Sequence, residues 1–242
     1  MSRIFRIVTV LSASLWSAAG CAQVERLAPT PPTTYFLAID VTASQAAEDF
    51  ARYPLVAHEA LSLLRPGDKV VVLLLDGSSE PVVQSVNDVE RHQSSVLKTA
   101  SQVGRAVRAL TLSKNMKGTT DLGGILAHVG RQIDLERAVE PNSPRAYRLL
   151  WVSDGQPTGK QTRADWRGFA DVDLRVAFFG ATPGARAKVE HLFSDGGFGG
   201  VDHLLVVEHS HVHQMLPQLA PFFGRRPNPD LEKRLAALDA RA

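Results

Sequence analysis

Residues 69–75 read KVVVLLL, and after Lys69 they form an unbroken apolar run of the kind that a strand buried on both faces of a sheet requires. Similar stretches recur along the chain, and segments with apolar residues at helical spacing lie between them. These further strand candidates are residues 35–40 (YFLAID), 147–152 (YRLLWV), 174–179 (LRVAFF) and 203–207 (HLLVV). Strands that alternate with helices predict an α/β fold, a doubly wound, mostly parallel sheet covered by helices on both faces.

The spacing of apolar residues also places the helices between these strands. They are expected over residues 45–64, 89–110, 122–139, 185–193 and 213–222. The first should end at Arg65-Pro66-Gly67, because proline and glycine both interrupt helices. Residues 81–86 are expected to form a short edge strand, since Pro81 cannot donate a hydrogen bond inside a sheet.

Length and composition are those of one globular domain with appendages. The chain has 242 residues, of which 44% are hydrophobic, and a formal net charge of only +2. It has no long run of Lys and Arg and no basic stripe interleaved with aromatic residues, so nucleic-acid binding has little support. We expect the domain to cover residues 35–224. A helical tail over residues 225–242 should restart at Asn228-Pro229-Asp230, where a capping residue precedes a proline.

The start of the chain has the pattern of a secretory signal peptide. Arg3 and Arg6 form a basic segment, residues 7–16 are apolar or small, and residues 17–20 are small and lead to Cys21. We therefore expect residues 1–20 to be removed from the mature protein. A buried N-terminal strand or helix is the alternative.

Cys21 is the only cysteine of the chain, so it cannot form an intramolecular disulfide. Residues 18–20 (AAG) before it resemble the lipobox of bacterial lipoproteins, although that family usually has Leu where Ala18 stands. The resemblance implies that Cys21 becomes the lipid-modified N-terminus. Residues 28–34 are rich in Pro and Thr, so we expect residues 21–34 to form an extended linker. Ala22, where some members have Asp, favours the outer membrane facing the periplasm. A plain secretory signal or a buried free cysteine remains the alternative.

Polar residues gather where the expected strands end, which is where open α/β sheets bind ligands. The three groups are Asp40-Val41-Thr42-Ala43-Ser44 after the first strand, Lys117-Gly118-Thr119-Thr120-Asp121 before a helix, and Ser153-Asp154-Gly155 after the strand that contains Trp151. Their carboxylates and hydroxyls are hard oxygen donors, which Mg²⁺ and Mn²⁺ prefer. A cation would also offset the repulsion between Asp40 and Asp154.

This combination resembles the metal-ion-dependent adhesion site of von Willebrand factor A (vWA) domains. That site has an Asp-x-Ser/Thr-x-Ser motif, a distal Thr in a Gly-Thr loop, and an Asp-Gly after a hydrophobic strand. The matching residues are Asp40, Thr42, Ser44, Thr120 and Asp154, with Thr119 as a competitor for the distal position. The resemblance implies that the hydroxyls contact the metal, that the aspartates often act through water, and that an Asp or Glu of a protein partner completes the coordination.

The expected function is therefore non-enzymatic, a metal-dependent protein-binding module tethered to the bacterial envelope. A haloacid dehalogenase-like phosphatase is one alternative, but that family wants a second Asp where Thr42 stands, and a hydroxyl at its ordinary pKa is a poor proton shuttle. The chain has no Gly-x-Ser-x-Gly elbow, P-loop or His-Glu-x-x-His motif. A structural vWA domain with an empty metal site is the other alternative.

One further stretch could bind metal. His209, His211 and His213 alternate and follow Glu208, so their imidazoles could lie on one face and hold Zn²⁺. A solvated connection between a strand and a helix explains the same residues. The sequence does not decide between these two interpretations.

Overall fold

The computed structural model describes residues 31–40, 57, 60–75, 82–88, 98–99, 101–105, 120–156, 162, 169, 171–195, 203–208 and 215–226. The chain divides into two units, Met1–Pro31 and Pro32–Ala242, and the fold below is that of the second. Several predictions lie outside the described residues. They concern the signal peptide, Cys21, Thr42, Ser44, Thr119, the histidines at 209, 211 and 213, and the tail after Asn228.

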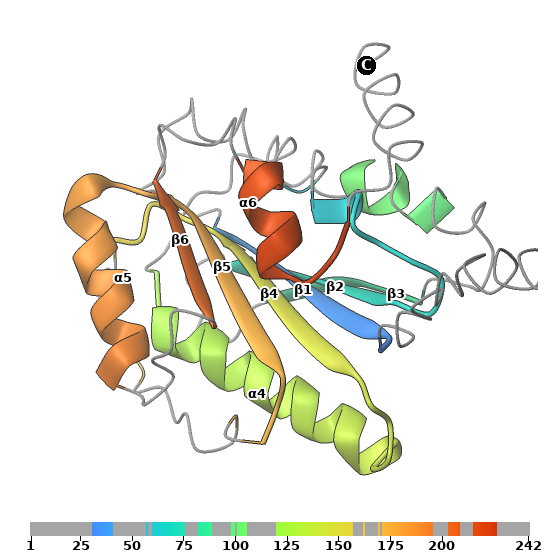
Figure 1. Cartoon of the computed structure of the whole chain (residues 1–242). Coiled ribbons are helices and arrows are strands. Elements are labelled where there is room, and N and C mark those ends of the chain that lie inside the picture. Colours follow the sequence, from blue (N-terminus) through green and yellow to red (C-terminus); the bar gives the residue numbers. More distant parts are fainter. Residues whose placement is uncertain are drawn as a thin grey trace, which may run out of the picture. The chain divides into compact units, whose positions relative to one another are not determined.

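The described residues form a sheet of six strands in the order β3-β2-β1-β4-β5-β6 (Figure 1). Their bounds are Thr33–Asp40 for β1, Lys69–Leu75 for β2, Val82–Asp88 for β3, Ala146–Val152 for β4, Leu174–Ala181 for β5 and Leu204–Glu208 for β6. Only β3, at one edge, runs antiparallel to its neighbour. The predicted doubly wound, mostly parallel sheet is confirmed, and so is the edge strand expected near Pro81.

Alternation along the central strand β1 supplies two separate cores. Tyr35, Leu37 and Ile39 pack on one face of the sheet, and Phe36 and Ala38 pack on the other. Every residue of β1 is buried, which explains why its middle part, Tyr35–Ile39, is apolar on both faces rather than alternating.

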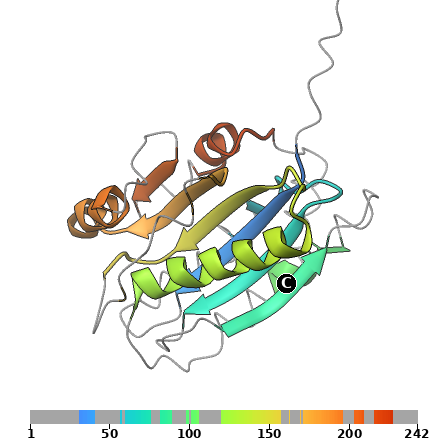
Figure 2. The same cartoon turned by 90° about the horizontal axis from the view of Figure 1, so that it is seen from below.

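Helices cover both faces of the sheet. The helices α4 (Leu122–Val139) and α5 (Pro183–Asp195) pack on the face of Phe36, and Figure 2 shows α4 lying across the central strands. The opposite face is covered by α6 (Met215–Phe222) and by helical residues around Ala60 and Val103. Among the described residues, no helix has the length and apolar character needed to span a membrane.

Element bounds differ from expectation at two places. The first helix gives way to turn residues after Leu61, three residues before the predicted end at Leu64. Strand β1 begins at Thr33, two residues early, because the Thr33 amide donates to the Asp68 carboxylate at 2.9 Å and the Thr34 hydroxyl donates to Glu136. The sheet therefore includes two residues that the sequence assigns to the linker.

Candidate metal site at the carboxyl edge of the sheet

Two hydroxyls converge on one buried carboxylate at the carboxyl edge of β1. Asp40 ends that strand and is fully buried. The Ser153 hydroxyl donates to Asp40 Oδ2 at 2.6 Å, and the Thr120 hydroxyl donates to the same oxygen at 3.3 Å. Because Ile39 pairs with Val152, the ends of β1 and β4 lie side by side. The structure thus brings together Asp40, Thr120 and Ser153, and Asp154 is the next residue of the chain after Ser153.

Asp154 lies in the turn that follows β4. The Gln156 amide donates to Asp154 Oδ1 at 2.9 Å, which orients the carboxylate, whereas no described residue donates to Oδ2. Gly155 has a φ of +71°, and a Cβ there would lie 2.9 Å from a methyl group of Val189. The expectation that glycine permits this sharp turn is confirmed, since other residues rarely adopt such a φ.

Thr120 owes its position to the start of α4. The next residue, Asp121, is the N-cap, and its Oδ1 accepts a hydrogen bond from the Gly124 amide at 3.1 Å. The same carboxylate accepts hydrogen bonds from the amide and the hydroxyl of Thr162. Sequence reasoning placed Ser153 and Asp121 in the polar groups at this edge but did not count either among the metal ligands.

The donor set fits a hard divalent cation. The described part of the site offers two carboxylates and the hydroxyls of Thr120 and Ser153, all of which are oxygen donors. No group of three or more His, Cys, Asp or Glu that could hold a metal occurs among the described residues. A site with only two carboxylates needs further oxygen ligands from hydroxyls or water, which suits Mg²⁺ or Mn²⁺ better than Zn²⁺.

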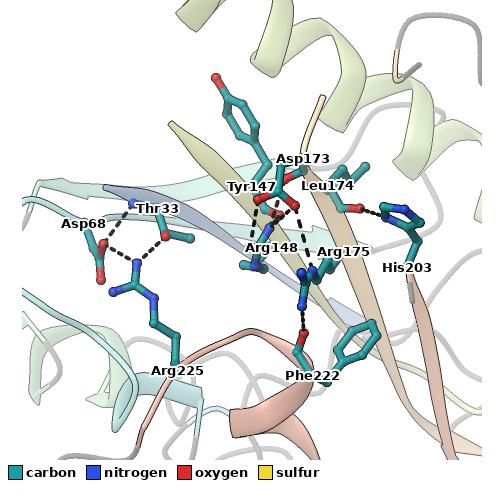
Figure 3. A network of polar contacts seen from close by, with 10 residues as sticks. All are labelled: Thr33, Asp68, Tyr147, Arg148, Asp173, Leu174, Arg175, His203, Phe222 and Arg225. Atoms are coloured by element: carbon teal, nitrogen blue, oxygen red, sulfur yellow. Dashed lines mark hydrogen bonds and ion pairs between the residues drawn. The ribbon is translucent and has the colours of Figure 1, made fainter. Parts of the chain in front are cut away.

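The opposite edge of the sheet carries a second polar cluster, which ties the end of the domain to its beginning (Figure 3). Arg225, just beyond α6, pairs with Asp68 at 3.2 Å, and their side chains are 2% and 1% exposed. Arg225 also donates to the Thr33 hydroxyl, and Asp68 accepts from the backbone amides of Thr33 and Arg65. Burial raises the pKa of the Asp68 carboxyl, whereas the Arg225 guanidinium and the two amides act to lower it.

A second arginine holds the neighbouring strands at this edge. Arg148 of β4 makes two parallel hydrogen bonds of 3.1 Å to the carboxylate of Asp173, and a third of 2.9 Å to its carbonyl. Arg175 of β5 donates to the Phe222 carbonyl at the end of α6. The hydrogen bonds that these two arginines donate go to groups of the fold, so we assign this cluster a structural role.

Comparison with known proteins found similar folds among solved structures. No known family matches the chain by sequence, and no curated protein matches it. Proximal thread matrix protein 1 from the mussel byssus superposes with a TM-score of 0.55 at 13% identity, over 78% of this chain and 47% of that one. This likeness supports the α/β fold described above.

Two other solved structures are similar with lower TM-scores. A von Willebrand factor type A protein from Catenulispora acidiphila has a TM-score of 0.46 and 15% identity, over 78% of this chain and 42% of its own. The pilus adhesin SpaC from Lactobacillus rhamnosus GG, in its open conformation, has a TM-score of 0.49 and 10% identity, over 86% and 31%. The chain spans less than half the length of each of these three structures.

Proposed function

We propose that this chain is a divalent-metal-dependent protein-binding module of the vWA class. The observation that carries the proposal is the convergence of the Thr120 and Ser153 hydroxyls on the Asp40 carboxylate, next to Asp154. In this proposal Mg²⁺ or Mn²⁺ is held by Asp40, Thr42, Ser44, Thr120 and Asp154. Thr42 and Ser44 enter through the sequence motif alone.

The residues of the proposed metal site differ in how far they are buried. Asp40 and Thr120 are fully buried, whereas Asp154 is 7% exposed and stands nearer to solvent. Buried ligands held by hydrogen bonds are already oriented before a cation binds. The protein supplies only part of an octahedron, which leaves room for water and for an Asp or Glu of a protein partner. The negative charge of that partner would meet the cation directly, so binding would require the metal.

A binding module accounts for the residues better than an enzyme does. A phosphatase of the haloacid dehalogenase type needs a carboxylic acid two residues after Asp40, where this chain has Thr42. Hydrolysis of a generic aryl phosphate in Mg²⁺ would favour that alternative. A vWA domain that is purely structural would bind no divalent cation.

The test is a calorimetric titration of the protein with Mg²⁺ and Mn²⁺, followed by capture of partners from membranes with Mg²⁺ or with EDTA. We expect saturable binding of one cation per chain and a set of captured proteins that EDTA removes. Ca²⁺ serves as a comparison, because it takes more ligands at longer distances. The absence of any cation binding would leave only the structural alternative.

We also propose that the module is lipid-anchored through Cys21 at the outer membrane, facing the periplasm. Mass spectrometry of the native protein should show that residues 1–20 are missing and that acyl chains are attached at Cys21. More than one chain is expected, because a single chain gives only marginal membrane binding. Cys21→Ala should release the protein from the membrane fraction, and an intact, unmodified N-terminus would contradict the proposal.

A further inference from the structure

One carboxylate joins the start of α4, next to Thr120 of the proposed site, to Thr162, a residue distant in sequence. Asp121 follows Thr120 directly and caps α4 through the Gly124 amide at 3.1 Å. Its Oδ1 also accepts from the Thr162 amide at 2.8 Å, and its Oδ2 accepts from the Thr162 hydroxyl. Thr162 is 41 residues further along the chain, in the segment that leaves β4 through Asp154.

A helix cap alone does not explain this arrangement. An N-cap needs one side-chain oxygen to accept an amide of the first turn, and serine or asparagine does this about as well as aspartate. Asp121 uses its second oxygen and a second amide on a residue outside the helix. With three donors on its two oxygens, its carboxylate is committed to the protein rather than to a ligand.

We propose that Asp121 is a positioning residue that fixes the start of α4 against Thr162, so that Thr120, the residue before it, is held ready for a cation. This inference rests on the proposed function, because it concerns the affinity of that same site. Its physical basis is preorganisation. A site whose ligands come from separate segments binds more tightly when the ordering of those segments is complete before the ligand arrives.

Two substitutions distinguish the link, which is the pair of hydrogen bonds from Thr162 to Asp121, from the cap, which is the hydrogen bond from the Gly124 amide to Asp121. Asp121→Ser keeps an oxygen for the Gly124 amide but cannot also reach both donors of Thr162. Thr162→Val removes the hydroxyl that donates to Asp121 Oδ2 and leaves the cap intact. Ser194→Ala is the control, because it removes a hydroxyl that bonds to the Glu190 carbonyl within α5.

Mg²⁺ affinity is measured by calorimetry for the full chain and each variant, and stability without metal is measured by urea denaturation. We expect Asp121→Ser and Thr162→Val each to weaken Mg²⁺ binding about 3- to 10-fold. The double variant should bind Mg²⁺ little more weakly than Asp121→Ser alone, because both substitutions act on the same link. Ser194→Ala should bind like the wild type, and the midpoint of urea unfolding of Thr162→Val should stay close to that of Ser194→Ala.

The possible results distinguish this inference from the proposed function. If the wild type binds no Mg²⁺, the proposed function fails and the inference fails with it. If the wild type binds Mg²⁺ and Thr162→Val binds it equally well, the metal site stands but the link has no role in it. A loss of affinity in Asp121→Ser alone would likewise overturn the inference, because the cap would then account for the effect.

Discussion

Arg225→Ala is expected to lower the free energy of unfolding by about 3–5 kcal/mol, a large part of the ~5–15 kcal/mol that stabilises a typical domain. The reason is that Asp68 would keep its buried position and lose its cation. The two side chains are 1–2% exposed and 3.2 Å apart, so water cannot replace the guanidinium without opening the fold. Arg225 also anchors the end of α6 to the first residue of β1, through the Thr33 hydroxyl (Figure 3).

The chain offers a matched control in the next residue. Arg226 is exposed, and Arg226→Ala removes the same charge with an expected change within about 0.5 kcal/mol. Urea denaturation followed by circular dichroism gives both values. Equal stability of the two variants would show that the buried pair contributes nothing.

The loss of unfolding free energy caused by Arg225→Ala should also depend on pH. Burial raises the pKa of the Asp68 carboxyl, and removing the Arg225 cation removes the strongest opposing influence, so the pKa rises further. A raised pKa means that the folded state holds this proton more tightly than the unfolded chain. The free energy of unfolding therefore falls as pH rises above the unfolded value of about 3.9, until the folded pKa is passed. The loss of unfolding free energy caused by Arg225→Ala, measured relative to Arg226→Ala, should therefore be smaller near pH 4 than at pH 7.

Arg225 also shows where sequence reasoning about the domain runs out. The expected boundaries, residues 35–224, omit both Arg225 and Thr33, which hold the two ends of the domain together. Apolar periodicity marks where helices and strands lie, but it cannot identify a buried charge beyond the end of a helix. In Gly-Arg-Arg-Pro at residues 224–227, the sequence does not distinguish the buried arginine from its exposed neighbour.

The elements predicted most accurately are those with the strongest local signals. Strand β2 and helix α4 have the bounds that the sequence predicts, because one is an unbroken apolar run and the other opens with a capping aspartate. Bounds were less accurate where tertiary contacts extend an element. Strand β1 gains Thr33 and Thr34 because Asp68 and Glu136, distant in sequence, accept their hydrogen bonds.

The candidate site was predicted in outline for a topological reason. Parallel strands end at the same edge of the sheet, so residues that follow β1 and β4 must meet there, and Asp40 and Asp154 do follow them. The roles of Ser153 and Asp121 could not be predicted in this way. Those roles depend on the register between β1 and β4 and on the direction in which each side chain points. The spacing of residue types in the sequence determines neither the register nor the direction.

Asp154→Ala is expected to abolish metal-dependent binding of the partner and to weaken Mg²⁺ binding by at least about 100-fold. Asp154 would supply one of only two negative charges in the described part of the site, so its removal takes away much of the attraction for a cation. Thr120→Ala should weaken Mg²⁺ binding less, because it removes a neutral ligand. Asp171→Ala, which removes an exposed carboxylate elsewhere on the domain, is the matched control for the change in net charge.

Stability measurements keep this prediction from being confused with unfolding. Asp154→Ala loses the hydrogen bond from the Gln156 amide, worth about 1 kcal/mol, but it also relieves repulsion from Asp40. Without metal, the variant should therefore unfold within about 1 kcal/mol of the wild type. Mg²⁺ at 100 times the wild-type Kd should stabilise the wild type and Asp171→Ala by about 2.7 kcal/mol, and Asp154→Ala by no more than about 0.4 kcal/mol. Partner binding that survives both EDTA and Asp154→Ala would show that the functional surface lies elsewhere.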